Sequence, residues 1–214
     1  MPAEFVSMIL RVPGFLLAIS VHEYAHAKMA YNLGDDTAQL LGRMTVEPWA
    51  HIDVVGSLML LIFGFGWAKP VPVNTYRLQN PRRDMAKISL AGPVANLITA
   101  LVLEILTVIL LIFVSFPGAL RYIPTVLEVG AWINAGLGFF NLIPVPPLDG
   151  SNILDVYISN SARDAWNWIQ RYGFVILVVL MVLGVVSAVM QPLVTGYMGF
   201  AQRMAIAISR IFIR

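Results

Sequence analysis

The chain has 214 residues, of which 58% are hydrophobic and only 12% are charged, and its mean hydropathy is +0.77. Soluble globular domains carry about a quarter charged residues, so this composition excludes that class and predicts a membrane protein. The net charge of +2 is small, and the basic residues lie in predicted loops and at the C-terminus, which argues against nucleic acid as a partner.

The first apolar stretch begins at about Phe5 and continues as a helical pattern to about Leu33, where Gly34 stops it. It has no basic leader and no small-residue cleavage site, so we interpret it as a retained membrane helix and not as a signal peptide. Pro13 is expected to kink this helix.

Two short extended pieces are expected after the first helix. Residues 37–50 are mixed, and the alternation from Leu41 to Glu47 favours a short strand at 41–48 that ends at Pro48. The prolines within 69–74 favour extended backbone there. Together they predict a short β-hairpin-like element at the membrane surface. The apolar residues between them, 52–66, are too few for a full crossing and are typical of a re-entrant segment.

Four later apolar stretches predict further crossings. They are residues 86–115, 125–141, 173–190 and 193–213, the last two separated at Gln191–Pro192. The expected fold class is therefore an all-α polytopic membrane protein with about five to six transmembrane helices. We expect a single integral-membrane domain over 1–214, with a catalytic core at about 4–155 and C-terminal helices at about 165–214.

The first apolar stretch contains the sequence His22-Glu23-Tyr24-Ala25-His26, an H-E-x-x-H pattern. Two histidines four residues apart on a helix share one face and can bind one Zn²⁺, while Glu23 beside them can act as a general base on an activated water. Such polar residues are costly in a membrane helix, which favours function over a chance match. The chain has no cysteine, so nitrogen and oxygen ligands are expected; they suit zinc, but also cobalt or iron.

A catalytic zinc needs a third protein ligand, for which His51 and the aspartates are the candidates. Asp149 lies in the segment 141–150, where three prolines break an apolar helix. Irregular backbone at membrane depth is tolerated only against protein or a water-filled cavity, which favours a site at Asp149. A proline-rich exit loop with a solvated aspartate fits the same residues equally well.

Four motifs occur together in this chain: H-E-x-x-H at 22–26, the segment 66–74, Ala91-Gly92-Pro93 with Asn96, and the segment 141–150. In this combination the chain resembles the site-2 protease family of intramembrane zinc metalloproteases, peptidase family M50. The resemblance implies one zinc ion bound by His22, His26 and Asp149, catalysis by Glu23, and an oxyanion or substrate-positioning role for Asn141. The chain differs from larger members of that family in having no inserted PDZ or appended CBS domain, so we expect a minimal catalytic core.

The loop 67–87 is strongly basic, so the positive-inside rule predicts that it is cytoplasmic. Counting crossings forward places 116–124 outside and 150–172 inside. If Asp149 shares an ion with the histidine pair, the active site then lies toward the cytoplasmic side, and 52–66 cannot cross completely.

The predicted function is a zinc-dependent intramembrane endopeptidase in a prokaryotic cell membrane, with the lipid bilayer and transmembrane protein or peptide substrates as partners. The alternatives are a metal-binding membrane transporter and an inactive protease homologue acting as a binding module. Glu23 favours the enzyme, because a transporter does not need a carboxylate beside its ligands that does not itself bind the metal. Of the other polar residues, Asn96 is expected to pack helices, His51 to lie at the interface, and Glu104 is not assigned to the metal.

Overall fold

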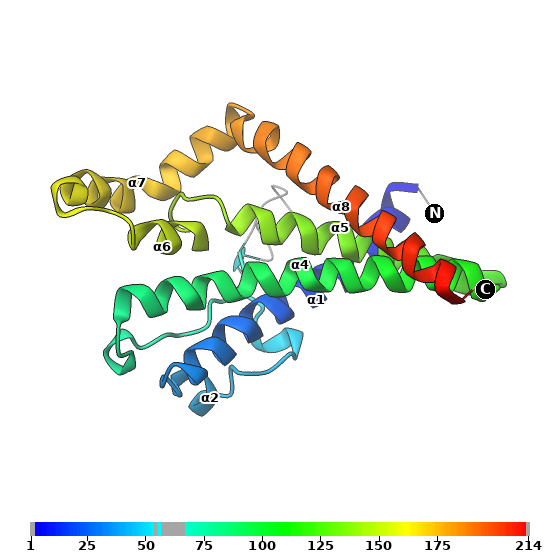
Figure 1. The fold of residues 1–214 in the computed structure, drawn as a ribbon, viewed down its shortest axis with the longest axis horizontal. Helices are drawn as coiled ribbons and strands as arrows, with labels where there is room; N and C mark the ends of the chain where they lie inside the picture. The colour runs from blue at the N-terminus through cyan, green and yellow to red at the C-terminus, as the bar shows by residue number, and fades with distance from the viewer. Residues whose placement is uncertain (1–2, 54, 57–66, 213–214) are drawn as a thin grey trace. The chain divides into compact units, whose positions relative to one another are not determined.

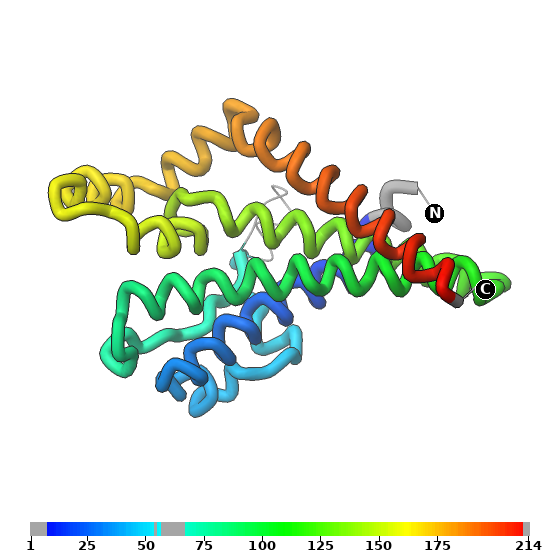
Figure 2. The backbone as a smooth tube through the Cα atoms, viewed as in Figure 1, coloured from blue at the N-terminus to red at the C-terminus, as the bar shows by residue number. Residues whose placement is uncertain are grey.

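The computed structural model describes residues 3–53, 55–56 and 67–212, and within these ranges the fold is helical, without strands. Figure 1 shows the elements as a ribbon, and Figure 2 traces the backbone through them in chain order. The long helices are α1 (Ala3–Asn32), α4 (Pro81–Phe113), α5 (Ile123–Asn141), α7 (Arg163–Val182) and α8 (Val185–Phe212). The short helices are α2 (Thr37–Leu40) and α6 (Asp149–Asp155). Short 3₁₀ helices lie in the connecting segments at Pro48–Ala50, Thr75–Arg77, Gly118–Tyr122 and Asn160–Ala162. The predicted all-α class is confirmed.

Four segments of the described chain are long and apolar enough to cross a membrane. They are Met8–Asn32, Pro81–Phe113, Gly118–Asn141 and Asn160–Val182. The first three correspond to predicted crossings. The predicted crossing at 193–213 falls within α8, which does not belong to this set; α8 carries Gln191, Arg203 and Arg210 among its apolar residues.

The boundary predicted at Gln191–Pro192 is wrong. The break lies at Leu183–Gly184, between α7 and α8, and Pro192 is inside α8. Gly184 has a φ of 74°, a left-handed conformation that ends a helix and that glycine adopts without steric cost. Proline inside a membrane helix is tolerated where neighbouring groups compensate, so the glycine here was the stronger stop signal.

The predicted hairpin of strands does not form among the described residues. Residues 41–47 contain only turns, bends and irregular backbone, and 67–74 carry neither helix nor strand. The backbone groups of 69–74 bond instead to scattered partners: Lys69 N–H donates to His51 O at 2.9 Å, and Arg43 Nη2 donates to the Lys69 carbonyl at 2.8 Å. Most of the predicted re-entrant segment, 52–66, falls outside the described residues, which include only 52–53 and 55–56 of it.

The described chain divides into two compact units. Unit 1 comprises Met1–Ala18, Asn96–Asn141 and Val175–Arg214, and unit 2 comprises Ile19–Ala95 and Leu142–Phe174. Helices α1, α4 and α7 each contribute residues to both units. The single domain predicted from the sequence stays a prediction.

Unit 1 is packed through small residues and one buried amide pair. Its core contains Ala100, Leu103, Ala131, Ala135 and Met198. Asn96 Nδ2 of α4 donates both to the Ala18 carbonyl of α1 and to Asn134 Oδ1 of α5, each at 2.9 Å, and both asparagines are fully buried. These bonds agree with the packing role expected for Asn96.

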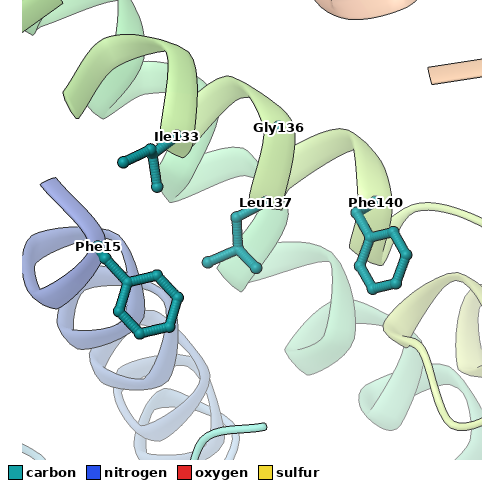
Figure 3. Close-up of a pocket in the computed structure, with 5 residues that line it drawn as sticks. All are labelled: Phe15, Ile133, Gly136, Leu137 and Phe140. Carbon is teal, nitrogen blue, oxygen red and sulfur yellow. The ribbon is translucent and has the colours of Figure 1, made fainter. Parts of the chain in front are cut away.

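An apolar pocket of about 260 Å³ also lies in unit 1, between α1 and α5. Figure 3 shows its lining, which consists of Phe15, Ile133, Gly136, Leu137 and Phe140. No titratable side chain lines this pocket, so its lining provides an apolar surface but no group that could act as a catalyst or a metal ligand.

Unit 2 is held together where the end of α1 meets the segment before α4. Ala30, Leu78 and Ile88 form a buried cluster there. The fully buried Asp35 accepts hydrogen bonds from Thr37 N–H at 3.1 Å and from Asn74 N–H at 2.7 Å. Burial would raise the pKa of Asp35, but these hydrogen bonds outweigh it and hold the pKa below its usual value.

Candidate metal centre

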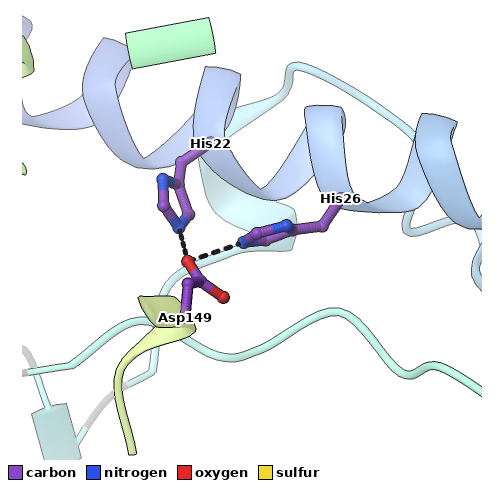
Figure 4. Close-up of side chains that lie close together, drawn as sticks. All are labelled: His22, His26 and Asp149. Atoms are coloured by element: carbon purple, nitrogen blue, oxygen red, sulfur yellow. Dashed lines mark hydrogen bonds and ion pairs between the residues drawn. The ribbon is translucent and has the colours of Figure 1, made fainter. Parts of the chain in front are cut away.

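Three potential metal ligands meet in unit 2, although one of them, Asp149, lies more than 120 residues after the two histidines in the sequence. His22 Nε2 lies 3.1 Å and His26 Nε2 lies 3.3 Å from the same oxygen, Asp149 Oδ2. Figure 4 shows both imidazoles of α1 directed at the carboxylate at the start of α6. One ligand atom from each residue lies within 4.8 Å of the other two.

These distances fit a tetrahedral zinc site. Two ligands that each bind one zinc at about 2.0–2.1 Å lie roughly 3.3 Å apart when the geometry is tetrahedral. The two measured distances, 3.1 and 3.3 Å, are close to that value. The donor set of two imidazoles and one carboxylate is also a known catalytic zinc set, and it leaves a fourth position open.

A second contact orients His26. Its Nδ1 lies 2.7 Å from the carbonyl oxygen of Ile88 in α4. A carbonyl can only accept, so Nδ1 carries a proton, and Nε2 is the ring nitrogen that faces Asp149 and could bind a metal there. Histidine ligands in metal sites are commonly fixed by such a bond from the other ring nitrogen.

Gly92 of α4 leaves room for the histidine pair. A Cβ atom at this position would lie 2.6 Å from His26 Cε1 and 2.7 Å from His22 Cε1. Real Cβ atoms do not approach other atoms this closely, so both imidazoles would have to shift. The glycine is therefore part of the centre, although it has no side chain.

Glu23 is buried beside the histidines and has a fixed partner. Its Oε2 accepts a hydrogen bond from the Val71 N–H at 2.8 Å. The bond holds the carboxylate in one place without using its second oxygen. A buried carboxylate that is anchored in this way can accept and return a proton at a defined position.

Asp149 is presented by a tight turn at the start of α6. Ser151 Oγ donates to the Leu148 carbonyl at 2.7 Å, and Gly150 packs against the carbonyl groups of Leu142 and Ile143 so closely that a Cβ would overlap them. Burial would raise the pKa of Asp149, but the bonds to His22 and His26 outweigh it and lower the pKa to about 2. The carboxylate is thus ionised at neutral pH, as a metal ligand must be.

The other sequence candidates have their own partners among the described residues. Asn141 ends α5 in unit 1, and its side-chain amide donates to the Leu137 carbonyl of its own helix at 3.0 Å. His51 is fully buried, and its Nε2 lies 2.8 Å from the Thr45 carbonyl oxygen. Of the candidates for the third ligand, the structure brings Asp149 to the histidine pair, and His51 is not part of the group.

Three contacts at this centre were not identified from the sequence. The Ile88 carbonyl and the Val71 N–H are backbone groups, which any residue type would supply, so no pattern of side chains marks them. Gly92 lies within the Ala91-Gly92-Pro93 motif, and its contact with the imidazoles emerges only when α4 lies beside α1.

The chain is similar to a metallopeptidase family model and to proteins whose names describe them as putative zinc metalloproteases. The family model "Peptidase family M50" matches residues 118–183, a range that includes Asp149. "Putative zinc metalloprotease YwhC" of Bacillus subtilis is 37% identical over 85% of this chain and 84% of its own. "Putative zinc metalloprotease MJ0611" of Methanocaldococcus jannaschii is 32% identical over 70% of this chain and 69% of its own. "Putative zinc metalloprotease Rip2" of Mycolicibacterium smegmatis is 28% identical over 94% and 77%. No solved structure matches the chain.

Proposed function

Because this chain belongs to peptidase family M50 and its relatives are named as zinc metalloproteases, we propose that it is a zinc-dependent intramembrane endopeptidase. Its substrates would be membrane proteins, cleaved in or near a transmembrane helix. The single observation that carries the proposal is the convergence of His22, His26 and Asp149 at ligand-to-ligand distances suited to one zinc ion.

In this proposal the two imidazoles and the Asp149 carboxylate hold the zinc, and Ile88 and Gly92 keep the imidazoles in place. When bound, zinc would supply a Lewis acid that activates water and polarises the scissile carbonyl group. The protein would supply the rest of the chemistry through its own side chains.

Glu23 is the proposed general base. Its carboxylate would take the proton from the attacking water and then deliver it to the leaving amine, so that peptide hydrolysis is balanced. The hydrogen bond from Val71 N–H leaves one carboxylate oxygen for this transfer. Asn141 is proposed to stabilise the oxyanion or to position the substrate through its side-chain amide.

The site is proposed to face the cytoplasmic side of the membrane. The strongly basic loop 67–87 supports this orientation, because such loops are retained inside. The same rule places 150–172, which follows the Asp149 turn, on the cytoplasmic side. A substrate helix would have to unwind locally before its peptide carbonyl could be attacked, since helical amides are hydrogen-bonded internally.

The observation that favours an enzyme over a metal transporter is the environment of Glu23. A transporter needs ligands that can bind and release the ion, and it gains nothing from a buried carboxylate that is anchored beside them. The same anchoring argues against an inactive homologue, which has no use for a general base.

Purified protein in detergent tests this proposal with Glu23→Gln and a panel of single-span peptides. We expect the zinc affinity of the variant to stay within about 2-fold of the wild-type value. Its cleavage rate should fall roughly 10²–10⁴-fold, which is the usual contribution of a general base. Glu47→Gln is the matched control, because Glu47 is exposed. Equal cleavage by wild type and Glu23→Gln would reject the assigned base.

A further inference from the structure

The short helix α6 determines where the Asp149 carboxylate points. It has seven residues, too few for a helix that is stable in isolation. The direction of Asp149 therefore depends on the contacts that dock α6 against the rest of unit 2. Apart from the contacts of Asp149 with the histidine pair and of Ser151 with Leu148, its side-chain hydrogen bonds among the described residues run to the first part of α4 and to the start of α7.

One of these contacts lies close to the metal centre. Asn152 Nδ2 donates to Ser89 Oγ of α4 at 2.9 Å. Asn152 follows Asp149 by three residues, so the two side chains share one face of α6. Ser89 is almost fully buried, which shields the bond from competition with solvent.

The same turn of α4 also contacts the two histidines. Ser89 follows Ile88, whose carbonyl accepts from His26 Nδ1, and it precedes by one turn Gly92, against which both imidazoles pack. Residues 88–92 of α4 thus contact the two proposed histidine ligands on α1. They also contact α6, which carries the third proposed ligand, Asp149. The distance between the histidine pair and Asp149 depends on how both are held to this stretch.

We propose that Ser89 and Asn152 are positioning residues of the metal centre. Their hydrogen bond fixes the rotation of α6 and thereby holds Asp149 Oδ2 within ligand distance of both imidazoles. This inference rests on the proposed function, because it takes His22, His26 and Asp149 as zinc ligands. Loss of such a contact outside the ligand shell commonly lowers metal affinity by 10–100-fold.

A separate cluster docks the far end of α6. Asp155 Oδ2 accepts from Arg82 Nε at 2.9 Å, and Asp155 Oδ1 accepts from Arg163 Nη1 at 2.6 Å. Removing the bond between Ser89 and Asn152 leaves α6 attached at its end by these ion pairs and at its start by the turn at Leu148–Ser151, but removes the side-chain bond from its first turn to α4. The expected defect is in the geometry of the metal site and not in the folding of the unit.

The test uses the full chain in detergent and the metal alone. Zinc affinity is measured against a competing chelator, and the visible absorption of bound Co²⁺ reports the geometry of the ligands. The variants are Ser89→Ala, Asn152→Ala and the double variant. Ser209→Ala is the matched control, since Ser209 is a buried helical serine of unit 1.

We expect each single variant to lose 10–100-fold in zinc affinity and to alter the cobalt spectrum. The double variant should lose no more than either single variant, because both remove the same bond. Metal-free Ser89→Ala should unfold at the temperature of metal-free Ser209→Ala. Should Ser89→Ala fail to accumulate, the partly exposed position of Asn152 allows Asn152→Ala to carry the same measurements.

Unchanged zinc affinity and an unchanged cobalt spectrum in both single variants would overturn the positioning role. A loss of affinity matched by an equal loss of stability in the metal-free protein would overturn it as well. Either result leaves the proposed function standing as long as His22→Ala loses zinc. If His22→Ala binds zinc as the wild type does, the proposed function itself fails.

Discussion

At the scale of single residues, Gly92 has the most sharply defined steric role. A methyl group there would overlap both imidazoles, which are themselves held by Ile88 and by the carboxylate of Asp149. The nearest atoms belong to rings fixed on two sides, so they cannot move aside without leaving the ligand position.

We therefore expect Gly92→Ala to weaken zinc binding by at least about 10-fold, comparable to the loss of an orienting contact. Chelator competition in detergent measures this affinity. Gly196→Ala is the matched control, because Gly196 also lies in a helix and a Cβ there would meet no atom within 4 Å. Zinc binding by Gly92→Ala equal to that of the control would show that the imidazoles do not pack as described.

Val71 offers a test of the Glu23 anchor through the backbone. Val71→Pro removes the N–H that Glu23 Oε2 accepts, whereas Val71→Ala keeps it. A hydrogen bond to a charged group contributes about 1.5–3 kcal/mol, so kcat should fall roughly 10–100-fold in the proline variant. Zinc affinity should stay within about 2-fold. Equal kcat values for the two variants would rule out a role for this bond.

The sequence was informative about this site to different degrees at different residues. His22, Glu23 and His26 are brought together by helix geometry alone, which a local pattern reports reliably. Asp149 comes more than 120 residues later in the chain, and from the sequence alone it was equally compatible with a solvated loop. Its approach to the histidines depends on the packing of α1, α4 and α6, which no local pattern encodes.

At the scale of elements, the helices were predicted better than the segments between them. Apolar length predicted α1, α4 and α5 because the hydrocarbon core sets a minimum span. The boundary between α7 and α8 was misplaced because proline was weighted above Gly184. The strands predicted at 41–48 and 69–74 were wrong because prolines 70 and 72 lack N–H groups and the neighbouring backbone bonds to side chains instead.

The ion cluster at the end of α6 gives an element-scale prediction. Burial would raise the pKa of Asp155, but the hydrogen bonds from Arg163 and Arg82 outweigh it and hold the pKa below its usual value. A carboxyl group whose pKa is lower in the folded than in the unfolded protein stabilises the folded state. This stabilisation is fully present above the pKa of the unfolded state, about 3.9, and is lost as the pH falls through the pKa of the folded state.

We expect Asp155→Asn to lower the unfolding free energy of the metal-free protein by about 1–3 kcal/mol at neutral pH. The difference from wild type should shrink as the pH falls below about 4, because the wild-type carboxylate is then protonated too. Asp164→Asn is the control, since Asp164 is exposed and has no ion pair among the described residues. A stability difference independent of pH would contradict the assignment. Thermal unfolding across this pH range measures it.

At the scale of the whole molecule, the proposed orientation in the membrane can be tested directly. The chain has no cysteine, so any introduced cysteine is unique. Tyr76→Cys and Tyr157→Cys place thiols at positions that are 98% and 79% exposed, in loops proposed to be cytoplasmic. Leu120→Cys, at a position 53% exposed, lies in a loop proposed to be outside.

An impermeant thiol reagent should therefore label Leu120→Cys in intact cells. It should label Tyr76→Cys and Tyr157→Cys only after the membrane is opened. Labelling of all three after permeabilisation is the control for reactivity. If Tyr76→Cys and Tyr157→Cys reacted from opposite faces, the proposed arrangement of crossings would be incorrect.

X-ray absorption of the zinc-loaded protein, wild type against Asp149→Ala, measures the zinc ligands themselves. We expect one zinc with nitrogen and oxygen neighbours at about 2.0–2.1 Å, including two imidazoles. The variant should keep the imidazoles, lose one oxygen neighbour and bind zinc more weakly. An unchanged ligand shell and affinity in Asp149→Ala would contradict the central claim that α1 and α6 hold one ion together.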